Sequence, residues 1–201
     1  MRLVLASNNA KKLAELQTLF APLGFEMVTQ GALGIAEAEE PHVTFVENAL
    51  AKARHAALHA KAAAIADDSG LCVDALAGAP GVLSARYATL FGEPKSDADN
   101  NRVLLQNMRD IDDRRARFVS ALVAVRSAED PEPLIALGRW PGVILREPKG
   151  GGGFGYDPLM FIPSLDQTVA ELSPDVKNAH SHRAIASQQM LALMREVWHL
   201  A

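Results

Sequence analysis

The chain alternates between short apolar runs and polar stretches that carry turn residues. Two of the runs, 3–6 and 159–162, have the length of buried strands. A longer run, 116–125, is apolar on both faces, which indicates a strand near the centre of a sheet. Residues 130–133 contain two prolines and lead into a second strand at 134–137, so this pair is predicted to form a hairpin.

Apolar residues spaced three or four positions apart predict amphipathic helices in four places. One follows the first strand from about residue 12, and three others begin at Thr44, Ser96 and Ser181. These three hydroxyl residues are favourable N-caps, because the side-chain oxygen accepts a hydrogen bond from a backbone N–H of the first turn. Glu47 stands three positions after Thr44, as in a capping box.

The composition narrows the class of protein without naming a function. The 201 residues are 49% hydrophobic and carry a formal net charge of −4, which gives no general basic surface for nucleic acid. One cysteine excludes an internal disulfide framework. No apolar run reaches the roughly 18 residues that span a bilayer, and the apolar start at 3–6 is too short for a secretory signal. We therefore expect a cytoplasmic protein with no nucleic-acid or membrane partner.

The stretch 64–70, Ala-Ile-Ala-Asp-Asp-Ser-Gly, is the most informative in the chain. Two carboxylates directly after a buried strand need a cation, hydrogen-bond donors or solvent, since burying them unpaired is costly. Gly70 suits a turn at this point, with another strand following at 71–76. The pair Asp67 and Asp68 fits either the metal-holding edge of a cleft or a solvated turn.

Cations stand at the start of two predicted helices. Lys11 and Lys12 follow a polar turn at 7–10, and His182 and Arg183 open the last helix. Positive charge is unfavourable there, because the helix dipole is already positive at the N-terminus. A bound phosphate would compensate it, and a strand, a polar turn and a helix start form a typical anion site. Solvated lysines and a surface histidine are the alternative interpretation.

The glycine-rich stretch 149–158 contains four consecutive glycines followed by Phe154 and Tyr156. Ordering so much glycine costs backbone entropy, so either a ligand approaches this backbone closely or the loop moves. The two aromatic rings suit stacking on a nucleobase, and Asp157 offers a hydrogen-bond acceptor. A flexible hairpin tip is the alternative.

Cations at helix starts, acids between them and an aromatic loop together indicate a nucleoside triphosphate bound with a divalent metal. Residues 30–43 are predicted to form an acidic loop without periodicity. Glu40 of this loop and Asp68 would supply the hard oxygen ligands that suit Mg²⁺.

Six motifs, in order, resemble those of the inosine triphosphate pyrophosphatase family, and the resemblance covers essentially the whole chain. They are Ser7-Asn8-Asn9-Ala10-Lys11-Lys12, Thr44-Phe45-Val46-Glu47-Asn48-Ala49, Ala66-Asp67-Asp68-Ser69-Gly70-Leu71, Gly81-Val82-Leu83-Ser84-Ala85-Arg86-Tyr87, Gly153-Phe154-Gly155-Tyr156-Asp157-Pro158 and Ser181-His182-Arg183 with Lys177 before it. Each motif is weak by itself, but six in the same order are specific. The run of four glycines departs from the family pattern at one position.

The resemblance implies an α/β fold, with an elongated mixed β-sheet flanked by helices and two lobes around a central nucleotide-binding cleft. It implies one pyrophosphatase domain over residues 1–201 and a homodimer. The implied reaction converts the purine nucleoside triphosphates ITP, dITP and XTP to the monophosphate and pyrophosphate, with Mg²⁺ as the cofactor. Such an enzyme keeps these nucleotides out of DNA and RNA.

The same resemblance implies a role for each matching residue. Asp68 would be the general base and, with Glu40, a magnesium ligand. The phosphates would be held by Ser7, Asn8, Asn9, Ala10, Lys11, Lys12 and Lys52. The substrate would also contact Ser69, while base and sugar would be held by Phe154, Gly155, Tyr156, Asp157, Lys177, His182 and Arg183. The exact metal ligands stay open among Glu37, Glu39, Glu40, Asp67 and Asp68.

Two other interpretations remain at this point. One is a nucleotide pyrophosphatase of another base preference, for pyrimidine or modified nucleotides. The other is a non-enzymatic nucleotide- or RNA-binding module. The net negative charge and the acid pair argue against the module, whose binding would depend strongly on salt.

Overall fold

The computed structural model describes residues 2–20 and 24–200, with the side chain of Lys11 outside the description. The strands are β1 Arg2–Leu5, β2 Glu26–Thr29, β3 Ala64–Val73, β4 Arg115–Val125, β5 Leu134–Ile144, β6 Met160–Ile162 and β7 Gln167–Thr168. The helices are α1 Ala10–Phe20, α2 Phe45–Ala60, α3 Asp97–Asn107, α4 Pro174–His180 and α5 His182–Val197, with 3₁₀ segments η2 Gly31–Leu33, η3 Asp74–Leu76, η4 Gly81–Phe91 and η5 Val169–Glu171.

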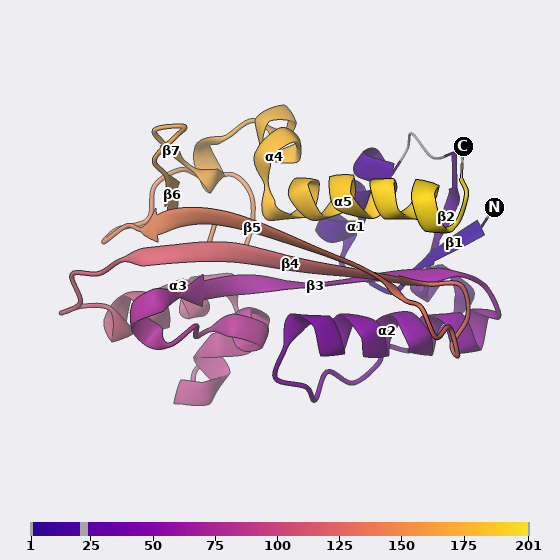
Figure 1. Cartoon of the computed structure of the whole chain (residues 1–201). Helices are drawn as coiled ribbons and strands as arrows, with labels where there is room; N and C mark the ends of the chain where they lie inside the picture. Colours follow the sequence, from indigo (N-terminus) through magenta and orange to yellow (C-terminus); the bar gives the residue numbers. More distant parts are fainter. Residues whose placement is uncertain (1, 21–23, 201) are drawn as a thin grey trace. The chain divides into compact units, whose positions relative to one another are not determined.

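The strands form a mixed sheet in the order β2-β1-β3-β4-β5-β6-β7 (Figure 1). β1 is parallel to both β2 and β3, whereas β6 is antiparallel to both β5 and β7. The helices and the mixed sheet confirm the α/β class.

The chain divides into two compact units. The first unit consists of Met1–Asp68, Ser120–Gly138 and Ser181–Ala201, and the second of Ser69–Val119 and Arg139–His180. Strands β3, β4 and β5 each pass from one unit into the other. The central cleft expected from the resemblance stays a prediction.

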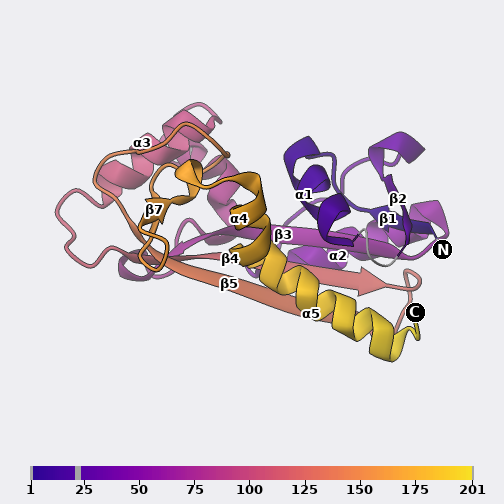
Figure 2. The ribbon, with the colours of Figure 1, turned by 90° about the horizontal axis from the view of Figure 1, so that it is seen from above.

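The first unit has an apolar layer on each face of its strands. Helices α1 and α5 pack on one face, where Leu16, Phe20 and Met190 meet Ile65 of β3. Helix α2 packs on the other face, where its alanines meet Ala64 and Ala66 of β3 (Figures 1 and 2). Successive side chains of a strand point to opposite faces, which explains why neighbouring residues of β3 belong to different layers.

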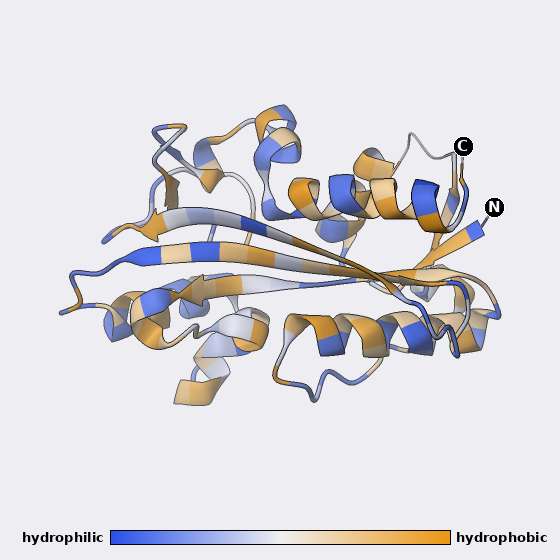
Figure 3. Cartoon of the chain, viewed as in Figure 1, coloured by the Kyte–Doolittle hydropathy of each residue, from blue (hydrophilic) through white to orange (hydrophobic). Residues whose placement is uncertain are grey.

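The second unit is built on a core of large side chains, which includes Trp140, Tyr156 and Met160. Arg114 ties the end of α3 to the end of β5, because its guanidinium donates to the carbonyl oxygens of Met108, Ile111, Ile144 and Leu145. Strand β4 is shared with the first unit, and most of its length is drawn in hydrophobic colours (Figure 3).

The predicted helix starts are confirmed. Thr44, Ser96 and Ser181 each accept a hydrogen bond from the backbone N–H three residues later. Helix α4, which carries Lys177, was not predicted, and neither was strand β2.

The turn predicted at Gly70 is wrong, because β3 is a single strand of ten residues that includes both acids. Gly70 is required for another reason: a Cβ there would collide with the Ser84 hydroxyl and the Gly81 carbonyl oxygen. Ser84 closes this contact, since its hydroxyl accepts a hydrogen bond from the Leu71 N–H at 2.9 Å.

Two further expectations need correction in the second unit. The loop predicted from Gly78 to Tyr87 is largely helical, because η4 runs from Gly81 to Phe91 with non-helical backbone angles at Arg86. The strand predicted at 134–137 extends to Ile144, so the Trp140–Ile144 stretch continues the sheet.

Candidate functional site

The two adjacent acids of β3 lie on opposite faces of the first unit. Asp67 shares the face of Ile65, toward α1 and α5, and Asp68 shares the face of Ala66, toward α2. Each carboxylate therefore meets different cations, although the two residues are neighbours in the sequence.

Asp67 is 1% exposed and holds two cations together. Its Oδ2 lies 3.0 Å from Lys12 Nζ and accepts a 3.4 Å hydrogen bond from Arg183 Nε. Its Oδ1 accepts a hydrogen bond from the Ser120 hydroxyl at 2.7 Å. Burial would raise the pKa of Asp67, but Lys12, Arg183 and the Ser120 hydroxyl outweigh burial and hold that pKa well below its usual value.

Asp68 is 6% exposed and has the opposite electrostatic balance. Its Oδ1 accepts a hydrogen bond from Lys52 Nζ at 3.0 Å, and its Oδ2 faces Asn48 Nδ2 at 3.4 Å. Burial raises the pKa of Asp68, with a smaller contribution from the nearby Glu40 carboxylate, and Lys52 offsets only part of this. A carboxylate of raised pKa has the basicity that a general base needs.

Lys52 joins Asp68 to the acidic loop. Its Nζ lies 2.6 Å from Glu40 Oε1 as well as 3.0 Å from Asp68 Oδ1. Burial would lower the pKa of Lys52, but these two carboxylates raise it above the usual value, so the ammonium group stays charged. Glu37 and Glu39 of the same loop are exposed.

Asp68 and Glu40 are the two carboxylates beside Lys52 that could hold a metal ion. No group of three His, Cys, Asp or Glu side chains that could hold a metal occurs among residues 2–20 and 24–200. Mg²⁺ is commonly bound by one or two carboxylates, and waters and phosphate oxygens complete its shell. Asp68 and Glu40, which share one cation here, fit that pattern.

The polar turn between β1 and α1 forms the helix start that was predicted. Asn9 caps α1, because its Oδ1 accepts a hydrogen bond from the Lys12 N–H at 3.1 Å. Ser7 Oγ accepts a hydrogen bond from the Asn9 N–H at 3.1 Å. Asn8, Asn9 and Ala10 are exposed. Lys11 lies in the first turn of α1, but its side chain is outside the described part of the chain.

The start of α5 brings a buried cation to the acids. Arg183 is 3% exposed, and its Nη1 donates to Glu15 Oε2 at 2.8 Å. The preceding His182 is also buried, which contradicts the interpretation as a surface histidine. Gly138 of β5 allows this close packing, since a Cβ there would collide with the His182 carbonyl oxygen. Arg183 thus lies with Asp67 and Glu15 in the first unit.

A second group of predicted residues assembles in the glycine-rich loop of the second unit. Lys177 Nζ lies 3.0 Å from Asp157 Oδ2 and 4.5 Å from the centroid of the Phe154 ring. The same Asp157 oxygen accepts a hydrogen bond from the Phe154 N–H at 2.9 Å. One carboxylate therefore fixes both the ring and the ammonium group that lies over it.

The neighbours of Phe154 have structural roles in the same unit. Gly155 is held on α3, because its N–H donates to Asp97 and its carbonyl accepts from Asn101. Tyr156 is 4% exposed, and its hydroxyl donates to the Ser84 carbonyl oxygen. Its ring belongs to the core, so the stacking face predicted for this loop is Phe154 alone.

Sequence reasoning missed several residues that organise these groups. Ser120 is the one polar residue within the apolar part of β4, and that exception could have indicated it. Glu15 stands three positions after Lys12 and so shares its side of α1. No local pattern pointed to Asp97 and Asn101, since their partner Gly155 is more than fifty residues away.

Ser69 follows Asp68 directly in β3 and is half-buried, at the point where the strand enters the second unit.

No described helix is both long and apolar enough to cross a membrane.

Comparisons with known proteins agree with the sequence motifs. The chain is 65% identical to a dITP/XTP pyrophosphatase of Leptothrix cholodnii, with 100% of each chain covered. It is 64% identical to a dITP/XTP pyrophosphatase of Methylibium petroleiphilum, over 98% of this chain and 99% of the other. Among solved structures, a HAM1 protein from Coxiella burnetii matches with a TM-score of 0.91 and 44% identity, over 98% of this chain and 100% of that one.

A family model agrees with these pairwise matches. The model of the Ham1 family matches residues 3–193, a range that contains every residue of the two groups described above. These matches confirm the resemblance that the six motifs indicated, and this chain belongs to the Ham1 family.

Proposed function

We propose that this chain hydrolyses the non-standard purine nucleoside triphosphates ITP, dITP and XTP to the monophosphate and pyrophosphate. Relatives named dITP/XTP pyrophosphatase, 64% and 65% identical over nearly the whole chain, support this activity. The observation that carries the proposal is the opposite electrostatic environment of the two adjacent acids. Asp67 is neutralised by Lys12 and Arg183, whereas Asp68 keeps a raised pKa beside Lys52.

Asp68 acts as the general base in this proposal. It takes a proton from a water whose oxygen attacks the α-phosphorus, while the bond from that phosphorus to the bridging oxygen breaks and pyrophosphate leaves. A carboxylate with a raised pKa is a stronger base than an ordinary one. Asp67 has no such role, because Lys12, Arg183 and the Ser120 hydroxyl outweigh burial and hold its pKa well below the usual value, which makes it a weak base.

The cations of the first unit hold the phosphates. Lys12 and Lys52 supply positive charge for the triphosphate and for the charge that develops on the leaving pyrophosphate. The turn Ser7–Ala10 offers backbone N–H groups at the start of α1, a typical position for an anion. Asp67 orients Lys12 and Arg183 for this purpose.

Magnesium is the cofactor in this proposal, with Asp68 and Glu40 as its protein ligands. When bound, Mg²⁺ would neutralise phosphate charge and orient the reacting phosphoryl group. The two carboxylates already share one cation, the Lys52 ammonium group, which supports a role for both as ligands of a metal cation.

Phe154, Asp157 and Lys177 hold the purine. The base stacks on the Phe154 ring, and the Lys177 ammonium, a donor without acceptors, favours a 6-keto oxygen over the 6-amino group of adenine. A site built around donors can reject a mispaired polar group by roughly 10⁴-fold in favourable cases.

Replacing Phe154 with Ala is expected to raise KM about tenfold for every purine substrate, because stacking on one base is worth roughly 1–3 kcal/mol. Steady-state kinetics with ITP and XTP measure the change. Tyr156→Phe is the matched control from the same loop, since it removes only the hydrogen bond to Ser84 and keeps the ring. Equal KM values for Phe154→Ala and the wild type would rule out stacking.

The decisive test of the function is product analysis with ITP, XTP, GTP and ATP, first with Mg²⁺ and then with EDTA. Pyrophosphate released from ITP and XTP, but barely from GTP or ATP, and lost with EDTA is the expected result. Orthophosphate release would instead mean attack at the terminal phosphate. No turnover of any triphosphate would contradict the proposal.

The homodimer and the cytoplasmic location remain predictions, and sedimentation equilibrium would test the dimer.

A further inference from the structure

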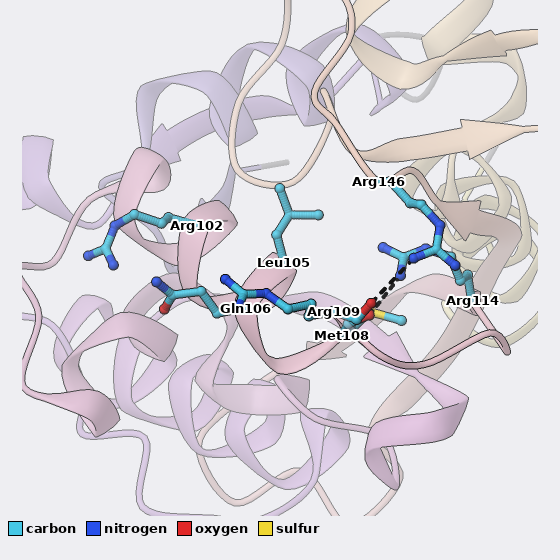
Figure 4. Close-up of a pocket in the computed structure, with 7 residues that line it drawn as sticks. All are labelled: Arg102, Leu105, Gln106, Met108, Arg109, Arg114 and Arg146. Carbon is cyan, nitrogen blue, oxygen red and sulfur yellow. Dashed lines mark hydrogen bonds between the residues drawn. The ribbon is translucent and has the colours of Figure 1, made fainter.

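The second unit contains a pocket of about 330 Å³ that neither group of site residues lines (Figure 4). Its lining comes from α3 and the residues just after it, from Arg114 before β4 and from Arg146 after β5. Its wall is made by Arg102, Leu105, Gln106, Met108, Arg109, Arg114 and Arg146. Four of these seven residues are arginines and none is an acid, which is an unusual concentration of one sign of charge.

Two of the arginines have carboxylate partners nearby. Arg102 is neutralised by Glu93 and Asp99, at 2.7 and 3.0 Å. Arg146 has a weaker partner, because Asp112 is fully exposed and 3.4 Å away. Water screens exposed ion pairs of this kind, so the attraction between the two charges is weak.

Arg109 and Arg114, the other two arginines of the pocket, have no carboxylate partner in the described parts of the chain. Arg114 is surrounded by backbone carbonyl oxygens and donates to four of them. Burial lowers the pKa of Arg114, and so does the positive charge of Arg146. No carboxylate among the described residues lies within ion-pair distance of Arg109, whose backbone carbonyl accepts a hydrogen bond from Arg146. The guanidinium groups of Arg114 and Arg146 lie close together in Figure 4.

We infer that this pocket binds a compact anion that carries two or more phosphate groups. Guanidinium groups present paired N–H donors that match phosphate oxygens, and like charges held close together are stabilised by an anion between them. A volume of about 330 Å³ stands at the low end of ligand pockets, which favours a small occupant. The uncharged residues of the wall are Leu105, Gln106 and Met108.

The inference does not depend on the proposed activity. It rests on charges within the second unit, whereas Asp68, Lys12 and Lys52 belong to the first. Inorganic pyrophosphate is the appropriate probe, because it is small, highly charged and has no base.

The experiment is a titration of the full chain with pyrophosphate in EDTA, followed by NMR of the arginine Nε–Hε groups. Residue-specific signals separate this pocket from any phosphate site at Lys12 and Lys52. Saturable shifts are expected at Arg109, Arg114 and Arg146. Arg109→Gln and Arg146→Gln should each weaken the binding about tenfold or more, since each removes charge-assisted hydrogen bonds.

The matched control is Arg115→Gln, which removes an exposed arginine that pairs with Asp113 and does not line the pocket. It should leave the affinity unchanged. Arg114 is left intact because its hydrogen bonds support the fold. The inference is overturned if the arginine signals do not saturate, if Arg109→Gln binds as the wild type does, or if sodium chloride at equal ionic strength gives the same shifts.

Discussion

Replacing Asp68 with Asn is expected to lower kcat by about 10²- to 10⁴-fold, the usual contribution of a general base. The amide keeps the size of the side chain and can still accept a hydrogen bond from Lys52. It cannot take a proton from water. Pyrophosphate release from ITP at saturating substrate measures the loss.

The fold of the Asp68→Asn variant should persist at neutral pH. Burial raises the pKa of Asp68, which means that folding disfavours its charged form. Above that raised pKa the ionised carboxylate therefore reduces stability, and the amide relieves this. Lys52 keeps Glu40 as a partner. The thermal midpoint of the variant is expected to be no lower than that of the wild type.

The pH dependence gives an independent check on Asp68. Since the carboxylate must be ionised to act as a base, kcat of the wild type should fall as pH decreases through the raised pKa, above the ordinary carboxyl value of 3.8. Asp74→Asn, a change just beyond the end of β3, is the control and should keep kcat. A rate for Asp68→Asn within threefold of the Asp74→Asn rate would remove Asp68 from the role of base.

Local signals in the sequence predicted the parts of the site that depend on one element. The caps at Thr44, Ser96 and Ser181 follow from side chains and backbone groups three residues apart. Asn48 and Lys52 stand four positions apart, so they share one side of α2, and both meet Asp68. Such contacts need only the period of a helix.

The different environments of Asp67 and Asp68 could not be predicted in this way. The pair was expected just after the end of a strand, at the edge of a cleft or in a turn, where neighbouring side chains have no fixed relation. In a continuous strand they alternate, so the cations of α1 and α5 reach one acid and those of α2 reach the other. Gly70 misled the prediction, because its lack of a side chain serves close packing against Ser84 rather than a turn.

Contacts between segments far apart in the sequence were also beyond prediction. Arg183, whose role in holding the base stays a prediction, is buried against Asp67 and Glu15, more than a hundred residues away in the sequence. The start of α5, which carries Arg183, packs closely against Gly138 of β5, and no repeating pattern in the sequence indicates this contact.

Replacing Asp67 with Asn is expected to lower the free energy of unfolding by about 3 kcal/mol at pH 7. Breaking a buried ion pair by removing one partner typically costs 3–5 kcal/mol, because the remaining charge is left without compensation. Arg183 is buried and keeps Glu15, so the lower end of that range applies. Urea unfolding measures the change, and Asp113→Asn, which alters an exposed pair with Arg115, is the control with little expected effect.

The Asp67 effect should depend on pH with a defined sign. The folded pKa lies well below the unfolded value near 3.9, so the stabilisation is fully present above about pH 5 and is lost progressively as pH falls from there toward the folded pKa. The difference between wild type and variant should therefore shrink at pH 3. Combining Asp67→Asn with Arg183→Gln should cost less than the two single changes added together, since the double variant no longer buries a guanidinium that has lost one of its two carboxylate partners. Strictly additive losses, or a difference unchanged at pH 3, would mean that packing rather than charge makes Asp67 important.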